Sequence, residues 1–182
     1  RLSLTPMVAE NDAIHGTAFT GSVDYRHGTT TGISAEERTL TVRALANTNT
    51  GRADFVRPGH IFPLIAKDGR VLMRSGHTEA AVDLCKLAGV EPVAAICELV
   101  NDDGTVMRGK EVAAFATQHK LKRIAVADLI AYRQAREKLV TRVTEFKVSS
   151  ELGDYNGYVY VTPFEDVHHE AFVYGNLGEG RG

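Results

Sequence analysis

The sequence of 182 residues predicts an α+β fold, a layered domain in which helices pack against strands. Short apolar runs typical of strands alternate with segments whose apolar residues recur at helical spacing. Hydrophobic residues make up 43% of the chain and charged residues 24%, which is ordinary for a globular protein with a core. The length suits one domain, or one domain with part of a second.

Local signals place the first elements. Ser34 and Glu37 have the spacing of a capping box, which predicts a helix from there to about Ala46. We expect strands at 17–23 and 61–66, with a loop at 28–32 before the helix. Asp68-Gly69 predicts a hairpin turn into a returning strand at 71–73.

The next elements continue the alternation. Helices are expected over 78–88 and 110–119 and from about Asp128, and strands over 93–100 and 123–126. Near Leu139 the pattern changes to strands only, at 143–148, 157–162 and 170–174. We therefore predict a domain over 1–138 and the start of an appended piece over 139–182.

Charge and sorting signals narrow the function classes. The formal net charge of −2 gives no sign of a broad basic surface, so we expect no nucleic-acid partner. No apolar run approaches the roughly 20 residues that span a bilayer, so no membrane partner is expected. Cys85 and Cys97 both lie in apolar stretches, which favours buried free thiols in a reducing compartment over a disulfide. With no sorting signal in the sequence, we expect a cytoplasmic protein.

The densest group of reactive side chains is Arg74-Ser75-Gly76-His77-Thr78, where an expected strand meets a helix. A helix N-terminus favours anions, and the Arg74 guanidinium suits a phosphate. Gly76 lets a ligand approach the backbone, and His77 can bind a metal or transfer a proton. The same pattern is also typical of a capped helix with an exposed Arg and His.

Two further residues stand out, each with an alternative. Glu98 interrupts the apolar run 93–100, and burying a lone carboxylate is costly unless it has a partner or a role in proton transfer. It could instead point to water. His60 follows the tight turn Arg57-Pro58-Gly59, and a lone His is more often structural than catalytic. The loop 28–32 could contact phosphate or only connect elements.

Taken together, four segments resemble the 3,4-dihydroxy-2-butanone 4-phosphate synthase family, in that family's order. They are Gly28-Thr29-Thr30-Thr31-Gly32-Ile33-Ser34, Arg57-Pro58-Gly59-His60-Ile61-Phe62-Pro63-Leu64, Arg74-Ser75-Gly76-His77-Thr78-Glu79-Ala80 and Glu98-Leu99-Val100-Asn101-Asp102-Asp103-Gly104-Thr105. Residues 128–133 resemble the last helix of that family.

The resemblance implies a three-layer α-β-α arrangement with a mixed sheet, and a homodimer with active sites at the subunit interface. It implies conversion of D-ribulose 5-phosphate to 3,4-dihydroxy-2-butanone 4-phosphate and formate, in riboflavin biosynthesis, with Mg²⁺ or Mn²⁺. By resemblance, Arg74 to Thr78 and Glu98 bind the sugar phosphate, and His77 is a metal ligand. His60 and Glu98 match the family's essential His and Glu.

The resemblance carries two further expectations. The family's acidic N-terminal loop would lie upstream of Arg1, so we expect residues 1–182 alone to release little formate. From Val143 onward, residues 145–148 and 169–175 resemble the start of a GTP cyclohydrolase II domain. The alternatives are a non-catalytic dimerising remnant of the family and a nucleotide-dependent RNA-modifying transferase of the related fold.

Overall fold

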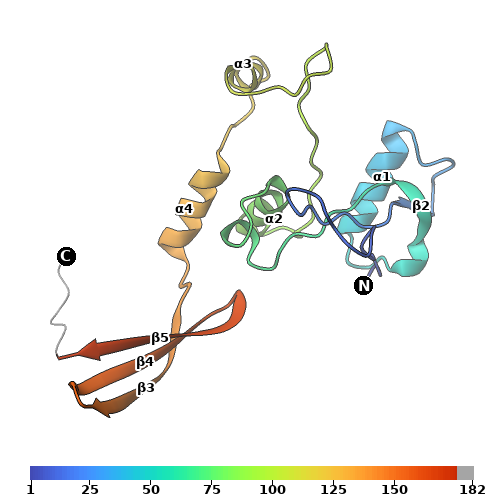
Figure 1. Ribbon diagram of the computed structural model, residues 1–182. Helices are drawn as coiled ribbons and strands as arrows, with labels where there is room; N and C mark the ends of the chain where they lie inside the picture. The colour runs from blue at the N-terminus through green and yellow to red at the C-terminus, as the bar shows by residue number, and fades with distance from the viewer. Residues whose placement is uncertain (176–182) are drawn as a thin grey trace. The chain divides into compact units, whose positions relative to one another are not determined.

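The computed structural model describes residues 1–175, and its internal contacts divide the chain into two units, Arg1–Leu129 and Ile130–Gly182. The helices are α1 (Ala35–Ala46), α2 (His77–Leu87), α3 (Lys110–Gln118) and α4 (Val126–Arg136). The strands are β1 (Val23–Tyr25), β2 (Phe55–Ile61), β3 (Thr141–Ser150), β4 (Gly153–Thr162) and β5 (Glu165–Tyr174) (Figure 1). Within residues 1–175 no helix combines the length and apolar character that a membrane crossing needs.

The first unit is built around α1 and the antiparallel pair of β1 and β2. The core cluster here consists of Val23 from β1, Ala44 and Leu45 from α1, and Phe55 from β2. The helix predicted from Ser34 is confirmed, because the Ser34 hydroxyl accepts the backbone N–H of Glu37. The strands predicted at 17–23 and 61–66 are mostly replaced by isolated bridges, such as Phe19 to Leu64.

The pairing of β1 with β2 has an irregularity next to Asp24. Asp24 pairs with Val56, whereas Val23 pairs with Ile61, so the register shifts between Val23 and Asp24. The residues of β2 between Val56 and Ile61 include Gly59, whose backbone runs directly over β1. An ideal Cβ at Gly59 would lie 2.1 Å from the carbonyl carbon of Val23, so only glycine fits there.

The hairpin predicted at Asp68-Gly69 is wrong, because residues Arg70–Leu72 form a 3₁₀ turn. The buried Asp83 of α2 accepts hydrogen bonds from the Arg70 guanidinium and from the backbone N–H of Val71. These bonds draw residues 70–72 onto the helix. A pattern of turn residues cannot predict a contact with a helix further along the chain.

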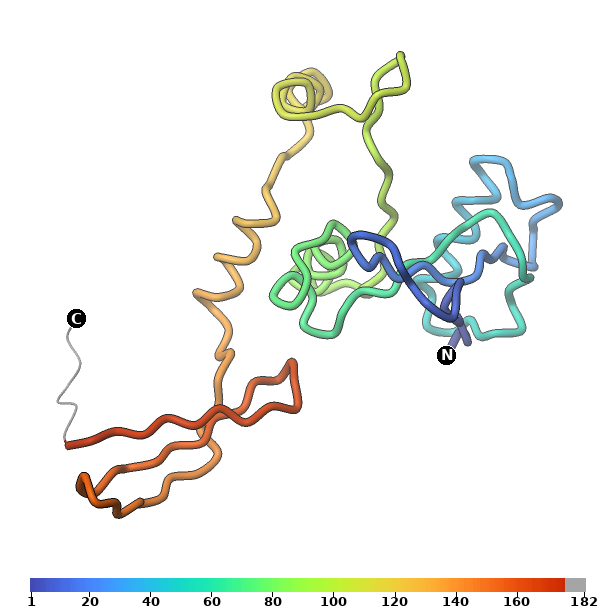
Figure 2. Tube along the Cα trace, viewed as in Figure 1, coloured from blue at the N-terminus to red at the C-terminus, as the bar shows by residue number. Residues whose placement is uncertain are grey.

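The strand predicted at 93–100 is also wrong within the described residues. Residues 92–99 form an extended segment without a ladder partner (Figure 2). Val100, at the end of the predicted strand, forms an isolated bridge with Val106. The strand predicted at 123–126 is likewise absent, and α4 begins at Val126. An apolar run becomes a strand only where a neighbour satisfies its backbone N–H and C=O groups. The helices predicted over 78–88 and 110–119 and near Asp128 are confirmed as α2, α3 and α4.

The second unit contains a three-stranded antiparallel sheet in the order β3-β4-β5. The strands predicted at 143–148, 157–162 and 170–174 are confirmed, each as part of a strand of 10 residues. Gly157 of β4 lies under the Phe146 ring, which packs edge-on against Phe172 with ring centroids 6.0 Å apart. Contacts divide the chain between Leu129 and Ile130, while the boundary predicted between 138 and 139 stays a prediction.

The α+β class is confirmed, because the described residues form helices together with antiparallel sheets. The three-layer arrangement with a mixed sheet stays a prediction. A mixed sheet contains parallel as well as antiparallel pairs, and the two sheets within residues 1–175 contain only antiparallel pairs.

Candidate active site

His60 lies at the end of β2, held by Asp24 of β1. The Asp24 Oδ1 atom accepts the backbone N–H of His60 at 2.8 Å, and Oδ2 lies 2.7 Å from His60 Nδ1. Asp24 is only 4% exposed, whereas the His60 side chain is 38% exposed. A buried carboxylate therefore holds a histidine whose side chain remains partly exposed.

The loop 28–32 supports this pair. Gly32 has φ of +83°, and an ideal Cβ there would lie 2.1 Å from Asp24 Oδ2, so a larger residue would displace the carboxylate. The Glu37 side chain accepts the backbone N–H groups of Thr30 and Gly32 and the Thr30 hydroxyl. The loop has a structural reason for its glycine and hydroxyl groups, beside the phosphate contact considered above.

Glu37 gives a prediction about acid. The backbone N–H of Thr30, with the Thr30 hydroxyl and other donors, lowers the pKa of Glu37 from 4.5 to about 2. Because this folded-state pKa lies below the unfolded value, Glu37 stabilises the fold above pH 4.5, and this contribution is lost as the pH falls toward about 2. Urea unfolding at about pH 6 and about pH 3 should show this acid loss.

A Glu37→Gln variant should have a flatter acid limb than the wild type, because its amide cannot ionise. Its NH₂ would also face a backbone N–H of the loop, so the variant should be less stable already at neutral pH. Equal acid sensitivity of the two proteins would contradict the role assigned to Glu37.

Arg74 lies immediately before α2, and its side chain is anchored in the fold. Its Nη1 donates to the carboxylate of Glu79, Nε donates to the His15 carbonyl at 3.0 Å, and Nη2 donates to the Thr17 hydroxyl at 3.0 Å. One N–H on each terminal nitrogen remains for an anion. The arginine is therefore pre-oriented, which suits a phosphate ligand and equally suits a structural ion pair.

Glu79 explains two neighbours in the same motif. It is 1% exposed, and its second oxygen accepts the backbone N–H of Lys67 at 3.1 Å. An ideal Cβ at Gly76 would lie 2.2 Å from Arg74 Nη1 and 2.6 Å from Glu79 Oε2. Gly76 is thus required by the Arg74–Glu79 pair, as well as leaving the start of α2 open to a ligand.

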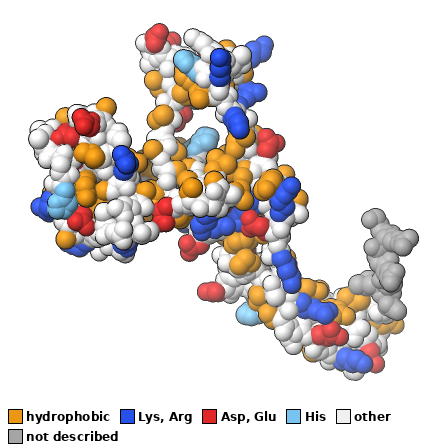
Figure 3. All heavy atoms as spheres, turned by 180° about the vertical axis from the view of Figure 1, so that it is seen from behind, with side chains coloured by type: hydrophobic (Ala, Val, Ile, Leu, Met, Phe, Trp, Pro, Cys, Tyr) orange, Lys and Arg blue, Asp and Glu red, His pale blue; other side chains and the backbone are white. Residues whose placement is uncertain are grey.

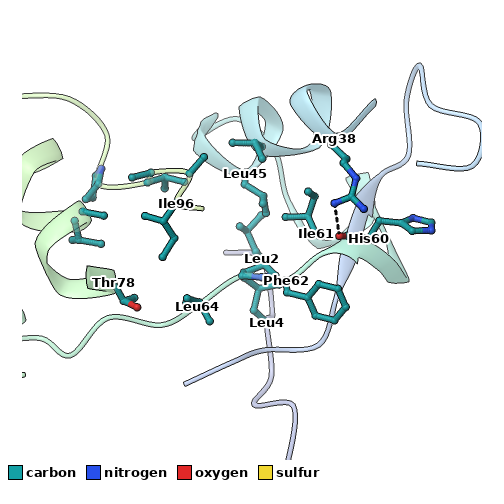
Figure 4. A pocket seen from close by; sticks show the side chains of 18 of the residues that line it. Leu2, Leu4, Arg38, Leu45, His60, Ile61, Phe62, Leu64, Thr78 and Ile96 are labelled. Carbon is teal, nitrogen blue, oxygen red and sulfur yellow. Dashed lines mark hydrogen bonds between the residues drawn. The ribbon is translucent and has the colours of Figure 1, made fainter. Parts of the chain in front are cut away.

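Four of the predicted site residues line two adjacent hollows, two residues in each. His60 and Thr78 line one of about 440 Å³, and Figure 4 shows them at its opposite ends. His77 and Glu98 line the other, of about 630 Å³, and the two hollows share lining residues Ala81, Ala95 and Ile96. The structure brings His77 and Glu98 to one hollow and places His60 at the neighbouring one.

The setting of Glu98 differs from the expected one. Glu98 is exposed, on the extended segment 92–99, so no burial cost has to be offset. His77 and Ser75 are exposed as well. A carboxylate and an imidazole that both face an open hollow remain available to a ligand.

A divalent metal fits this donor set poorly. Within residues 1–175 no three His, Cys, Asp or Glu side chains gather closely enough to hold an ion. Mg²⁺ prefers six ligands that are mostly oxygens, and a single imidazole is a weak site for it. His77 therefore provides one candidate ligand, and the described residues do not complete a metal site.

A comparison with protein families shows to which family the chain belongs. The model of the 3,4-dihydroxy-2-butanone 4-phosphate synthase family matches residues 1–132. The chain belongs to this family. The synthase match contains every candidate site residue: His60, Arg74, Ser75, Gly76, His77, Thr78 and Glu98. Their individual roles stay predictions.

Relatives of the synthase family are similar over the whole chain. Riboflavin biosynthesis protein RibBA of Salinispora arenicola is 48% identical over 181 residues, which cover 100% of this chain and 43% of that protein. The RibBA protein of Bacillus cytotoxicus is 50% identical over 177 residues, covering 97% and 44%. The chain spans less than half the length of these curated relatives.

Solved structures of 3,4-dihydroxy-2-butanone 4-phosphate synthases are also similar to this chain. A two-domain 3,4-dihydroxy-2-butanone 4-phosphate synthase, RibBX from A. baumannii, is 41% identical with a TM-score of 0.89, covering 98% of this chain and 53% of that one. A synthase in complex with two magnesium ions is 42% identical with a TM-score of 0.68, covering 74% and 68%. The likeness of residues 143–175 to GTP cyclohydrolase II stays a prediction.

Sequence reasoning missed Asp24, Glu37 as a loop anchor, and Glu79 as the partner of Arg74. Each is an acid beside a glycine-containing motif, and Asp24 adjoins an apolar strand residue, Val23. A charged residue directly after an apolar residue of an expected strand was the signal available in the sequence. Its partner could not be identified, because His60 lies 36 residues away.

Proposed function

We propose that the protein converts D-ribulose 5-phosphate to 3,4-dihydroxy-2-butanone 4-phosphate and formate, a step of riboflavin biosynthesis. The observation that carries the proposal is the family match over residues 1–132, which contain all the candidate site residues. The reaction needs no oxidant or reductant, because the five-carbon sugar phosphate contains the atoms of the four-carbon product plus formic acid.

The residues have distinct roles in this proposal. The free N–H groups of Arg74 and the start of α2 bind the phosphate, because a guanidinium and a helix N-terminus both favour anions. Glu98 and His60 transfer protons during enolisation and rearrangement. Ser75, Gly76 and Thr78 complete the phosphate site.

His77 would be one ligand of a Mg²⁺ or Mn²⁺ ion, and a bound ion would supply Lewis-acid chemistry. A synthase of this family has been solved with two magnesium ions, which supports a metal requirement. The residues described here provide only part of such a site.

The metal gives its own prediction. Residues 1–182 as an isolated protein should bind Mg²⁺ weakly, with little heat in a calorimetric titration, because one imidazole cannot replace a shell of oxygen ligands. A His77→Ala variant, titrated in parallel, should remove what heat there is. Tight binding that survives in His77→Ala would mean that the ligands lie elsewhere.

The test of the function is a formate assay on the full-length protein with Mg²⁺. We expect one formate for each ribulose 5-phosphate consumed, and no formate after removal of the metal with a chelator. Ribulose 5-phosphate left unconsumed, or consumed without formate, would refute the proposal.

We also propose that the protein forms a homodimer, as the family resemblance implies. Large apolar side chains are exposed on the first unit, among them Leu84, Leu87, Ile96 and Ile124, and Figure 3 shows apolar side chains on the surface in the view from behind. Exposed apolar patches often mark interaction sites. Analytical ultracentrifugation should give twice the chain mass, and a monomer at all concentrations would contradict the proposal.

A further inference from the structure

Asp24 holds His60 at two points with a single carboxylate. Oδ1 accepts the backbone N–H of His60 at 2.8 Å, and Oδ2 lies 2.7 Å from Nδ1 of its ring. Both contacts come from a side chain that is 4% exposed. The ring cannot turn away without breaking a hydrogen bond to a buried, charged acceptor.

The surroundings fix the carboxylate and the backbone of His60. Gly32 lies so close that a Cβ would be 2.1 Å from Oδ2, and Gly59 lies equally close to the backbone of β1. The Arg38 Nη1 donates to the His60 carbonyl at 3.2 Å (Figure 4). Gly32 therefore limits movement of the Asp24 carboxylate, and Arg38 holds the backbone of His60.

The chemistry of the two groups determines where the ring proton lies. An ionised carboxylate only accepts hydrogen bonds, so Nδ1 must carry the proton. A neutral imidazole that is protonated at Nδ1 has a lone pair at Nε2, and the His60 side chain is 38% exposed. We propose that Asp24 is a positioning residue that keeps His60 in the Nδ1–H tautomer and so makes Nε2 a proton acceptor. The kinetic part of this proposal rests on the proposed function, whereas the tautomer does not.

An Asp24→Asn variant separates this role from a merely structural one. The backbone N–H of His60 can only donate, so the amide oxygen must occupy the position of Oδ1. The amide NH₂ then faces Nδ1, which has to become the acceptor. Both hydrogen bonds survive in this nearly isosteric variant, but the ring proton moves to Nε2, and His60 loses its free lone pair.

The experiment is a long-range ¹H–¹⁵N correlation spectrum of the imidazole nitrogens in the full-length protein, with His60 assigned from a His60→Gln variant. We expect the Nδ1–H tautomer in the wild type and the Nε2–H tautomer in Asp24→Asn. With ribulose 5-phosphate, kcat of Asp24→Asn should fall about 100-fold or more while KM changes little. Asp12→Asn, a change at an exposed acid, should alter neither the spectrum nor kcat.

Several results would overturn the proposal. An Nε2–H tautomer in the wild type would do so alone, even if Asp24→Asn failed to fold. An unchanged tautomer in Asp24→Asn, or an inverted tautomer with unchanged kcat, would also overturn it. Failure of the wild type to release formate would refute the proposed function and the kinetic part, and the spectrum would still decide the tautomer.

Discussion

A Glu98→Gln variant of the full-length protein is expected to form 3,4-dihydroxy-2-butanone 4-phosphate about 100-fold or more slowly than the wild type, the usual scale for removal of a general acid–base group. Glutamine keeps the size of the side chain but cannot take or give the proton. Glu98 is exposed and lines the same hollow as His77, so the loss should appear in kcat and leave the fold unchanged. Formate release at saturating substrate measures it.

Glu91→Gln is the matched control. Glu91 is an exposed acid just ahead of the same extended segment, and it is absent from the lining of both hollows. Its amide variant should keep wild-type kcat and unfold at the same temperature as Glu98→Gln. If Glu98→Gln retained most of its activity, another group would have to transfer the proton, and His60 would be the next residue to substitute.

The second large effect concerns stability. Glu79→Ala should lower the free energy of unfolding by about 3 kcal/mol, since removing one partner of a buried ion pair leaves an uncompensated charge. Glu79 is 1% exposed, and its loss would leave Arg74 Nη1 and the Lys67 backbone N–H without their acceptor. Urea unfolding monitored by circular dichroism gives the difference.

Glu36→Ala provides the control for Glu79→Ala. Both glutamates lie in the first turn of a helix, so both favour the helix N-terminus, but Glu36 is exposed. Its variant should lose less than about 1 kcal/mol. Comparable losses in the two variants would show that the helix end, and not the pair with Arg74, accounts for the effect.

The sequence determined those elements whose signals are local. Ser34 and Glu37 predicted the start of α1, because a capping hydrogen bond joins residues one helical turn apart. The strand-like pattern after Leu139 predicted β3, β4 and β5, whose ladder partners follow one another closely along the chain. Local patterns singled out His60, Arg74, His77 and Glu98 as candidates, and the resemblance to the synthase family gave them roles that stay predictions.

Only the tertiary structure decided what depends on distant partners. The apolar run 93–100 did not become a strand, because no neighbouring strand within residues 1–175 pairs with its backbone. Asp24 contacts His60 at the point where the register of β1 and β2 shifts. Asp83 lies more than ten residues after the 3₁₀ turn at 70–72 and accepts the backbone N–H of Val71. A sequence shows which groups are present, but hydrogen bonds between distant segments form only when the fold brings donor and acceptor within about 3 Å.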